Sequence, residues 1–279
     1  MGALKDFSTY AAVGTFVVYL CGYLALRFHL TALGVVTGLG VLDDRYLFAG
    51  AKFLVFLAAE LPLLAIVGLP AGVLAWWLWR RLPALHKRAA ALFTNAALLL
   101  WTSVILAILV IELWMAACLP LENLSLSGPP EPAWLFNLLR NPEPMSRTLF
   151  FIGLLICAAA VCTPVIVASR LPLSTRPLKA LFGVAVLLAA ITALLVPVNF
   201  GVVVMPYSMG RVAALGKTPS PPGQHAWLLW EGKDWMTYYV QAGDRRQVVS
   251  VPAKEIDRIE VSGSDSLFDV IYPAGGGRQ

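Results

Sequence analysis

Five long apolar runs occupy most of this chain and constrain its fold more than any other feature. They cover residues 7–26, 46–79, 89–118, 148–169 and 180–204. An α-helix rises about 1.5 Å per residue, so roughly 20 apolar residues cross the ~30 Å hydrocarbon core of a bilayer. We therefore predict a mainly α fold, a polytopic membrane helix bundle of about five transmembrane helices in a domain of residues 1–206. A small extramembrane β domain is expected over residues 207–279.

The composition supports a membrane protein. The chain is 59% hydrophobic and only 13% charged, whereas soluble domains are about half apolar and about a quarter charged. A water-soluble core of this size cannot hide such a surplus. The formal net charge of +5 lies entirely within residues 1–206, so it reflects membrane topology rather than a nucleic-acid surface.

The charge of the connecting segments predicts the orientation. Segments 80–88 and 170–179 carry seven Lys or Arg residues and no acids, whereas segments 27–45 and 119–147 carry four basic residues against five acids. Short basic loops stay on the cytoplasmic side. We therefore expect a cytoplasmic N-terminus and a periplasmic or extracellular C-terminal domain. The excess of Arg over Lys, with abundant Ala, Leu, Gly and Pro, favours a bacterial protein of the plasma (inner) membrane.

Past residue 206 the pattern changes to short alternating runs separated by turns. Strands are expected over residues 211–215, 226–231, 236–241, 247–251 and 258–261, with a helical turn over 253–257 and a sixth strand over 267–272. This order resembles a small SH3-like or Sm-like barrel. The aromatic residues of this region form either its core and membrane-facing rim or a partner-binding patch; the candidates are Trp227, Trp230, Trp235 and Tyr238.

Three ionisable residues fall inside the apolar runs, where an unpaired charge is costly. Lys52 and Glu112 lie at similar depths in adjacent crossings, so we expect an ion pair between them, direct or through water. The alternatives are an ion or proton pathway and snorkelling to the surface. Glu60 lies deeper, within reach of hydroxyls such as Thr102 and Ser103, and is either a neutral packing residue or a proton-coupling carboxyl.

Other apolar features predict packing rather than chemistry. Pro62 and Pro70 predict a kink or tilt in the second crossing. The glycine-rich segment Thr31–Leu42 predicts an interfacial or re-entrant segment, and paired glycines at 34/38 and 68/72 predict close helix contacts. A surface helix is expected over Ala133–Leu139. The four cysteines are interpreted as apolar packing residues.

The sequence contains no catalytic, cofactor or metal-binding motif, so we expect no enzyme activity, cofactor or metal. The leading hypothesis is a non-enzymatic accessory or structural subunit of a membrane-protein complex. Its partners would be membrane lipids and other membrane subunits or a second copy, without nucleic acid, and the β domain would dock them. The alternative is an ion channel or proton-coupled transporter that uses Glu60, Lys52 and Glu112.

Overall fold

A computed structural model gives the fold of most of the chain. It describes residues 2–35, 44–81, 95–118, 133–141, 144–212, 214–215, 218–219, 224–242, 245–256 and 259–272. The predictions for residues 36–42, for the basic segment 82–88 and for most of the 119–147 connection lie outside the described residues.

The described part of residues 2–204 is mostly helical. The helices are α1 (Gly2–Ala32), α2 (Asp44–Arg81), α4 (Ala96–Cys118), α5 (Ala133–Arg140), α6 (Pro144–Ala168), α7 (Arg176–Asn199) and a π-helical turn, η2 (Phe200–Val204). Four segments are long and apolar enough to cross a membrane: Ser8–Ala32, Ala96–Ala116, Met145–Ala168 and Arg176–Val204. The protein is therefore a multi-pass membrane protein. The long helix α2 is not among these four, so the count of five crossings stays a prediction.

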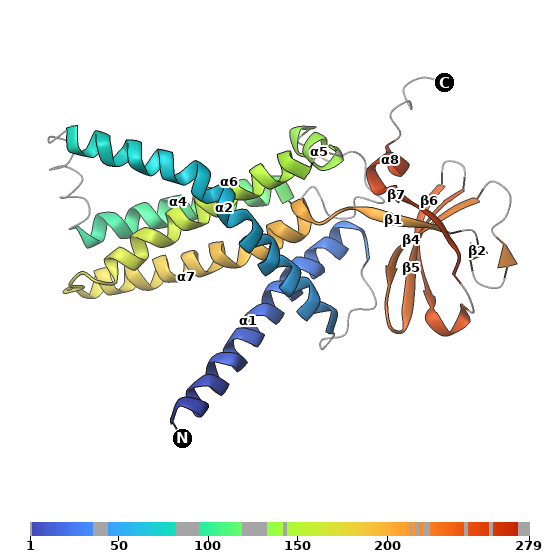
Figure 1. Ribbon diagram of the computed structural model, residues 1–279, viewed down its shortest axis with the longest axis horizontal. Coiled ribbons are helices and arrows are strands. Elements are labelled where there is room, and N and C mark those ends of the chain that lie inside the picture. The colour runs from blue at the N-terminus through green and yellow to red at the C-terminus, as the bar shows by residue number, and fades with distance from the viewer. Residues whose placement is uncertain are drawn as a thin grey trace.

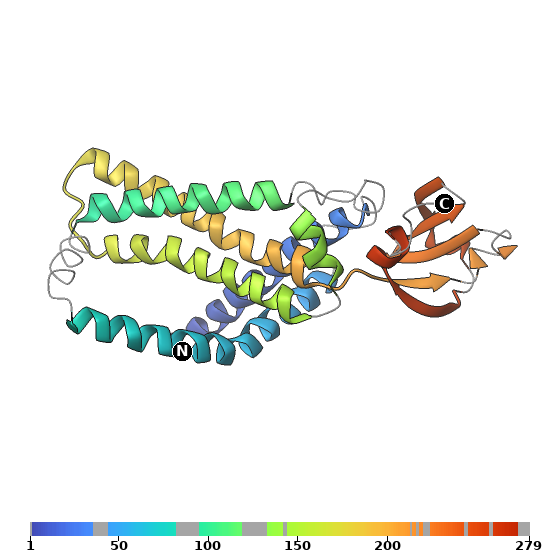
Figure 2. The ribbon, with the colours of Figure 1, turned by 90° about the horizontal axis from the view of Figure 1, so that it is seen from above.

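Local signals explain where several helices begin, end or bend. Gly34 follows α1 with a φ of 77°, a left-handed conformation that glycine adopts readily, so it ends the helix. Pro177 occupies the first turn of α7, where its missing N–H costs nothing. Helix α2 continues through Pro62 and Pro70 and changes direction along its length (Figures 1 and 2), as proline predicts.

The helices form two groups that meet at η2. Helices α4, α6 and α7 pack around a core that includes Leu100, Val161 and Ala185, and they lie side by side in Figures 1 and 2. Helix α2 packs mainly on α1, and α1 in turn contacts α7 and η2. An aromatic cluster of Phe53, Phe151 and Phe200 joins the two groups.

Glycines allow the closest approaches between helices. A Cβ added to Gly22 of α1 would overlap the main-chain carbonyl of Tyr46, and one added to Gly50 of α2 would overlap that of Val18. Gly201 of η2 contacts the carbonyl of Ala25 in the same manner. Small residues at helix contacts are the usual means of tight packing in membranes.

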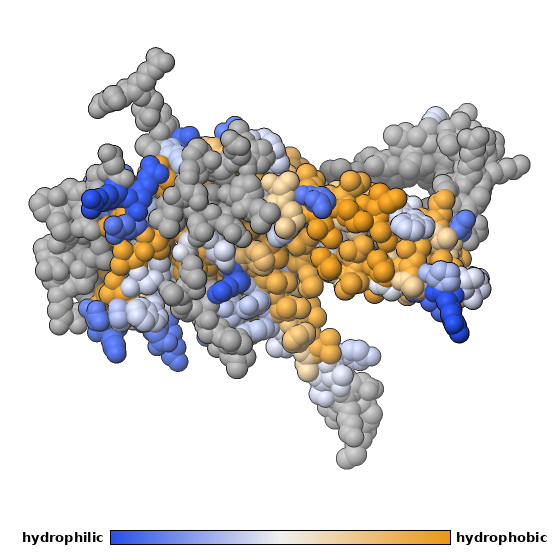
Figure 3. All heavy atoms as spheres, turned by 180° about the vertical axis from the view of Figure 1, so that it is seen from behind, coloured by the Kyte–Doolittle hydropathy of each residue, from blue (hydrophilic) through white to orange (hydrophobic). Residues whose placement is uncertain are grey.

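The outer surface of the helices is apolar. Between 17% and 33% of the residues in each candidate span are buried within the chain, so most of their apolar side chains need lipid around them. Figure 3 shows hydrophobic side chains gathered over the helical part, with hydrophilic ones towards the β domain and at the opposite end.

The C-terminal region forms an antiparallel sheet. Its strands are β1 (Ser208–Val212), β4 (Gln224–Glu231), β5 (Trp235–Ala242), β6 (Arg245–Pro252) and β7 (Val261–Ser266), in the order β6-β5-β4-β1-β7. Between β1 and β4 in the sequence, β2 (Ala214–Leu215) and β3 (Thr218–Pro219) pair with each other as a separate two-stranded sheet. A 3-10 turn, η3 (Ala253–Glu255), separates β6 from β7 where a helical turn was predicted.

Two predictions at the C-terminus are wrong. Residues 267–272 form no sixth strand, because Leu267–Ile271 is the short helix α8, which buries Leu267, Phe268 and Ile271 on one side. The last strand runs over Val261–Ser266 rather than 258–261. Its sequence, VSGSDS, lacks an apolar alternation. Polar side chains of this edge strand, Asp265 and Ser262, bind Arg211 of β1 instead.

Candidate functional site

The link between the last membrane helix and the sheet is a structured joint rather than a flexible tether. Tyr207 follows η2 and donates a hydrogen bond from its hydroxyl to the Val202 carbonyl, 2.7 Å away. Its own carbonyl accepts a 2.8 Å hydrogen bond from the Leu267 amide at the start of α8. Its ring lies 4.9 Å from the ring of His29 in α1 and 5.3 Å from that of Phe268.

One hydrophobic core crosses this joint. It contains Leu30 from the end of α1, Leu135 from the surface helix α5, Val203 from η2, Trp227 from β4 and Phe268 from α8. Because the ends of the membrane helices and one face of the sheet share these contacts, the β domain is fixed against the bundle.

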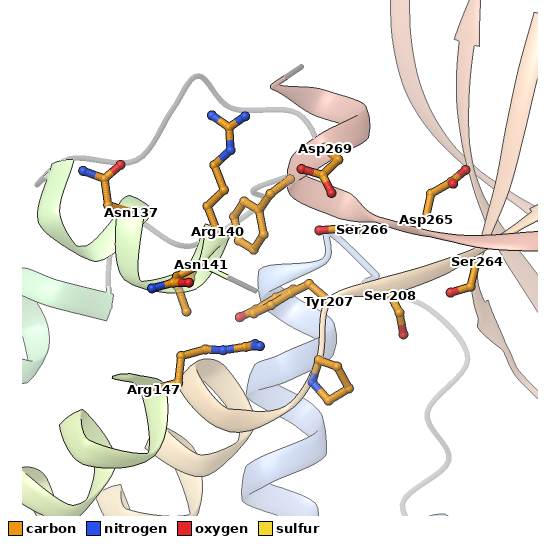
Figure 4. Close-up of a pocket in the computed structure, with 13 residues that line it drawn as sticks. Asn137, Arg140, Asn141, Arg147, Tyr207, Ser208, Ser264, Asp265, Ser266 and Asp269 are labelled. Atoms are coloured by element: carbon orange, nitrogen blue, oxygen red, sulfur yellow. The ribbon is translucent and has the colours of Figure 1, made fainter. Parts of the chain in front are cut away.

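A cavity of about 580 Å³, lined by both polar and apolar residues, opens beside Tyr207. The membrane side contributes Asn137, Arg140 and Asn141 of the α5 segment and Arg147 of α6; the sheet side contributes Ser208, Ser264, Asp265, Ser266 and Asp269. Figure 4 shows that Arg147 points towards the segment that carries Tyr207, whereas Arg140 extends from α5 away from Tyr207 and from Arg147.

The two arginines of the cavity have unused hydrogen-bonding capacity. The Nε of Arg147 is buried and has no hydrogen-bond partner, and neither Arg140 nor Arg147 forms an ion pair within the described residues. A buried guanidinium N–H without a partner is costly, and guanidinium groups match carboxylates and phosphates in geometry. The guanidinium side of the cavity is therefore suited to an anionic group, while Asp265 and Asp269 on the sheet side bring the formal charge of the whole lining to zero.

Asp265 is already engaged on the sheet side. Its carboxylate accepts hydrogen bonds from Trp227 Nε1 at 2.7 Å and from Arg211 Nε and Nη2 at 2.8 and 2.7 Å. The hydrogen bond from Trp227, followed by those from Arg211, holds the pKa of this carboxyl below its ordinary value. Asp265 therefore holds β7 to β1 and β4.

Of the predicted intramembrane polar residues, Lys52 and Glu112 do not pair. Both side chains are exposed on different helices, and within the described residues they form no ion pair. A direct ion pair is absent because α2 packs mainly on α1, while α4 packs on α6 and α7. The form of the contact that is bridged by water stays a prediction. Glu60 is half-buried on α2.

The two hydroxyl candidates on α4 have different roles. Ser103 is fully buried and donates a 2.8 Å hydrogen bond to the Val161 carbonyl of α6. Thr102 is exposed and donates to the Leu98 carbonyl of its own helix. Ser103 therefore joins two helices, and neither hydroxyl bonds Glu60 in the structure.

The aromatic candidates of the β domain divide between core and surface. Trp227 and Tyr238 are buried, at 7% and 0% exposure, and belong to the core. Trp230 is half-buried beside Arg45, whose guanidinium carbon lies 5.0 Å from its ring. Trp235 is 41% exposed, so it is the member with most surface to offer a partner.

Sequence reasoning missed the residues that build the joint and the cavity. His29 and Tyr207 lie in different parts of the chain, and nothing in their spacing indicates contact. Arg140 and Arg147 stand seven residues apart in the sequence, with two prolines between them, and this spacing is the one available signal. Among the residues that the structure describes, no group of three His, Cys, Asp or Glu side chains is placed to hold a metal ion.

Comparison with known proteins adds no relative. No protein-family model matches the chain, and neither a curated protein nor a solved structure shows significant similarity to it.

Proposed function

We propose that this chain is a non-enzymatic accessory subunit of a membrane-protein complex, whose C-terminal β domain docks other subunits at the membrane surface. In this proposal five helices cross the bilayer, and the β domain is an SH3-like barrel. The shared core described above supports the proposal, because a domain fixed to the bundle presents its docking surface in one orientation.

The strand arrangement supports the SH3-like assignment. Strands β1, β4, β5 and β6 are antiparallel neighbours in this order. The 3-10 turn η3 then precedes the fifth strand, β7, which pairs with β1. Such small barrels serve many functions, so the fold alone does not select a partner.

The arrangement of the helix ends supports five crossings with the β domain outside. In Figure 1 the C-terminal ends of α2 and α6 and the N-terminal ends of α4 and α7 lie at the end of the bundle away from the β domain. The basic segments 80–88 and 170–179 join these helix ends in the sequence, and basic segments favour the cytoplasm. Reporter fusions within residues 170–175 and after residue 272 should report opposite sides of the membrane, and the same side for both would overturn this orientation.

The observation that carries the docking proposal is the outer strand β6. All eight of its residues pair in register with β5, from Trp235 with Pro252 to Ala242 with Arg245, and no described strand pairs with its other side. A long, regular edge presents unpaired backbone groups to which a partner strand can add. The opposite edge, β7, is shorter and its pairing with β1 shifts register between Arg211 and Val212, which makes it a poorer template.

Purification in mild detergent, followed by measurement of mass and identification of co-purifying subunits, tests this proposal. Val249 on β6 and Val261 on β7 are both exposed edge valines, at 37% and 55%, so they offer a matched pair. We expect Val249→Lys to release the partner and Val261→Lys to retain it. A wild-type chain that is monomeric and without partners, or equal loss in both variants, would contradict docking at β6.

The channel or transporter alternative has no comparable support. It requires Lys52, Glu60 and Glu112 to serve one pathway, and two of these side chains are exposed on different helices. Reconstituted wild-type and Glu60→Gln proteins provide its test, since a proton-coupled transporter should lose pH-dependent flux in the variant.

A further inference from the structure

A second hollow lies on the membrane-facing side of the joint, between α2, the end of η2 and the end of β4. It is a groove of about 970 Å³ with a mainly apolar lining. Phe48 and Val55 form its α2 wall, and Phe200 and Val204 form the opposite wall. Phe48 and Val55 are 65% and 69% exposed, so the groove is open to its surroundings rather than filled by the chain.

The position of the groove along the membrane follows from its walls. Val204 is the last residue of the candidate span Arg176–Val204, so the groove extends to the level where this span leaves the bilayer. On α2 its lining includes Arg45, Lys52 and Ala59, which are seven residues apart and therefore lie on one helix face. From Lys52 to Ala59 the helix rises about 10 Å, within a single leaflet of roughly 15 Å.

The charge of the groove is positive where the membrane surface is expected. Its ionisable lining residues are Arg45, Lys52 and Glu231, with a sum of +1. Arg45 donates to the main-chain carbonyl of Glu231 and lies against Trp230. Lys52, in contrast, forms no ion pair or hydrogen bond within the described residues, although it stands among apolar side chains.

We propose that this groove binds one anionic phospholipid of the leaflet next to the β domain. An acyl chain lies along the α2 face between Val55 and Phe200, and the Lys52 ammonium binds the lipid phosphate. A phosphate supplies the counter-charge that the described chain does not, and an acyl chain fills an apolar groove that water does not favour. This proposal does not depend on docking at β6.

Native mass spectrometry of the full chain from mixed detergent and lipid tests it, with phosphatidylglycerol and phosphatidylethanolamine as probes at equal concentrations. We expect one tightly retained phosphatidylglycerol per chain. Loss of a charge-assisted contact should weaken retention by about tenfold or more in Lys52→Ala, while Lys52→Arg should retain the lipid. Lys179→Ala, an exposed lysine at the far end of the bundle, serves as the matched control and should behave as wild type.

A second variant tests the acyl-chain part independently of charge. Ala59→Trp places a large side chain at the deep end of the groove without removing a cation, and it should also reduce retention. Equal retention of the two lipids by wild type, unchanged retention in Lys52→Ala, or a wild-type groove occupied by a co-purifying protein without lipid would each overturn the proposal.

Discussion

The imidazole Nδ1 of His29 lies 2.9 Å from the main-chain carbonyl oxygen of Gly201, at the point where the first and last membrane helices meet. Because a carbonyl oxygen only accepts, Nδ1 carries the proton. Gly201 is also the residue whose missing side chain lets η2 contact the backbone of Ala25. The α1 segment with Ala25 and His29 therefore contacts Gly201 of η2 through both a close backbone approach and a hydrogen bond, next to the joint to the β domain.

Replacement of His29 tests the hydrogen bond at this joint. His29→Leu leaves the buried Gly201 carbonyl without its donor, so we expect a loss of stability of about 1–3 kcal/mol. His29→Asn retains a donor and should lose less. Thermal unfolding in detergent, read by size-exclusion chromatography of the heated protein, measures the effect. His225→Leu, at an exposed position, is the control, and equal losses for the two leucine variants would argue against the bond.

The crossing of α1 and α2 yields a second prediction. A Cβ at Gly22 would overlap the Tyr46 carbonyl, so Gly22→Ala must separate the two helices and should cost about 1–3 kcal/mol. Gly14 lies on the same helix with nothing near its Cβ position. Gly14→Ala should therefore leave stability unchanged or raise it by up to about 1 kcal/mol. The same heated-protein assay compares them, and similar results would show that the crossing tolerates a methyl group.

Features that depend on local sequence were predictable. Apolar length identified the four candidate spans, and the amphipathic segment Ala133–Leu139 is helix α5 over Ala133–Arg140. Residues 232–234 connect β4 to β5, between the strands expected over residues 226–231 and 236–241. In each case the signal is contained within a few neighbouring residues.

Features that depend on which elements become neighbours were not predictable. A pairing of Lys52 with Glu112 assumed that crossings adjacent in sequence are adjacent in space, but α2 packs on α1 instead. Residues 267–272 alternate like a strand, yet the contacts of Phe268 with Tyr207 and Phe136 stabilise a helical turn there. The cavity combines Arg147 with residues more than 50 positions away, and no short sequence pattern records such a combination.

Ser103 and Thr102 are neighbours on α4 with different hydrogen-bond partners, which gives a third prediction. Ser103→Ala removes the bond to Val161 of α6, and hydrogen bonds between membrane helices contribute about 0.6 kcal/mol on average, up to about 1.7. Thr102→Ala removes only a bond within its own helix at an exposed position. We expect a measurable loss of stability in the first variant and little change in the second. A larger loss in Thr102→Ala would contradict the assigned roles.

Asp265 gives a prediction for the pH dependence of the β domain. Its folded-state pKa lies below its ordinary value of 3.8, so the folded protein favours the ionised carboxylate. The resulting stabilisation is fully present above about pH 4 and is lost as the pH falls through the lower folded pKa. Asp265→Asn removes this stabilisation at neutral pH and weakens the acceptor for the largely buried Trp227 indole, so the free energy of unfolding should fall by about 1 kcal/mol. Tryptophan fluorescence during thermal unfolding at several pH values should therefore show a difference in stability between wild type and variant that shrinks towards pH 3.

Asp269→Asn is the control for this prediction. Asp269 is exposed on α8 and has no hydrogen bond or ion pair to described residues, so the stabilities of this variant and wild type should not converge at low pH. If they do converge, general acid denaturation rather than the Asp265 contacts explains the effect.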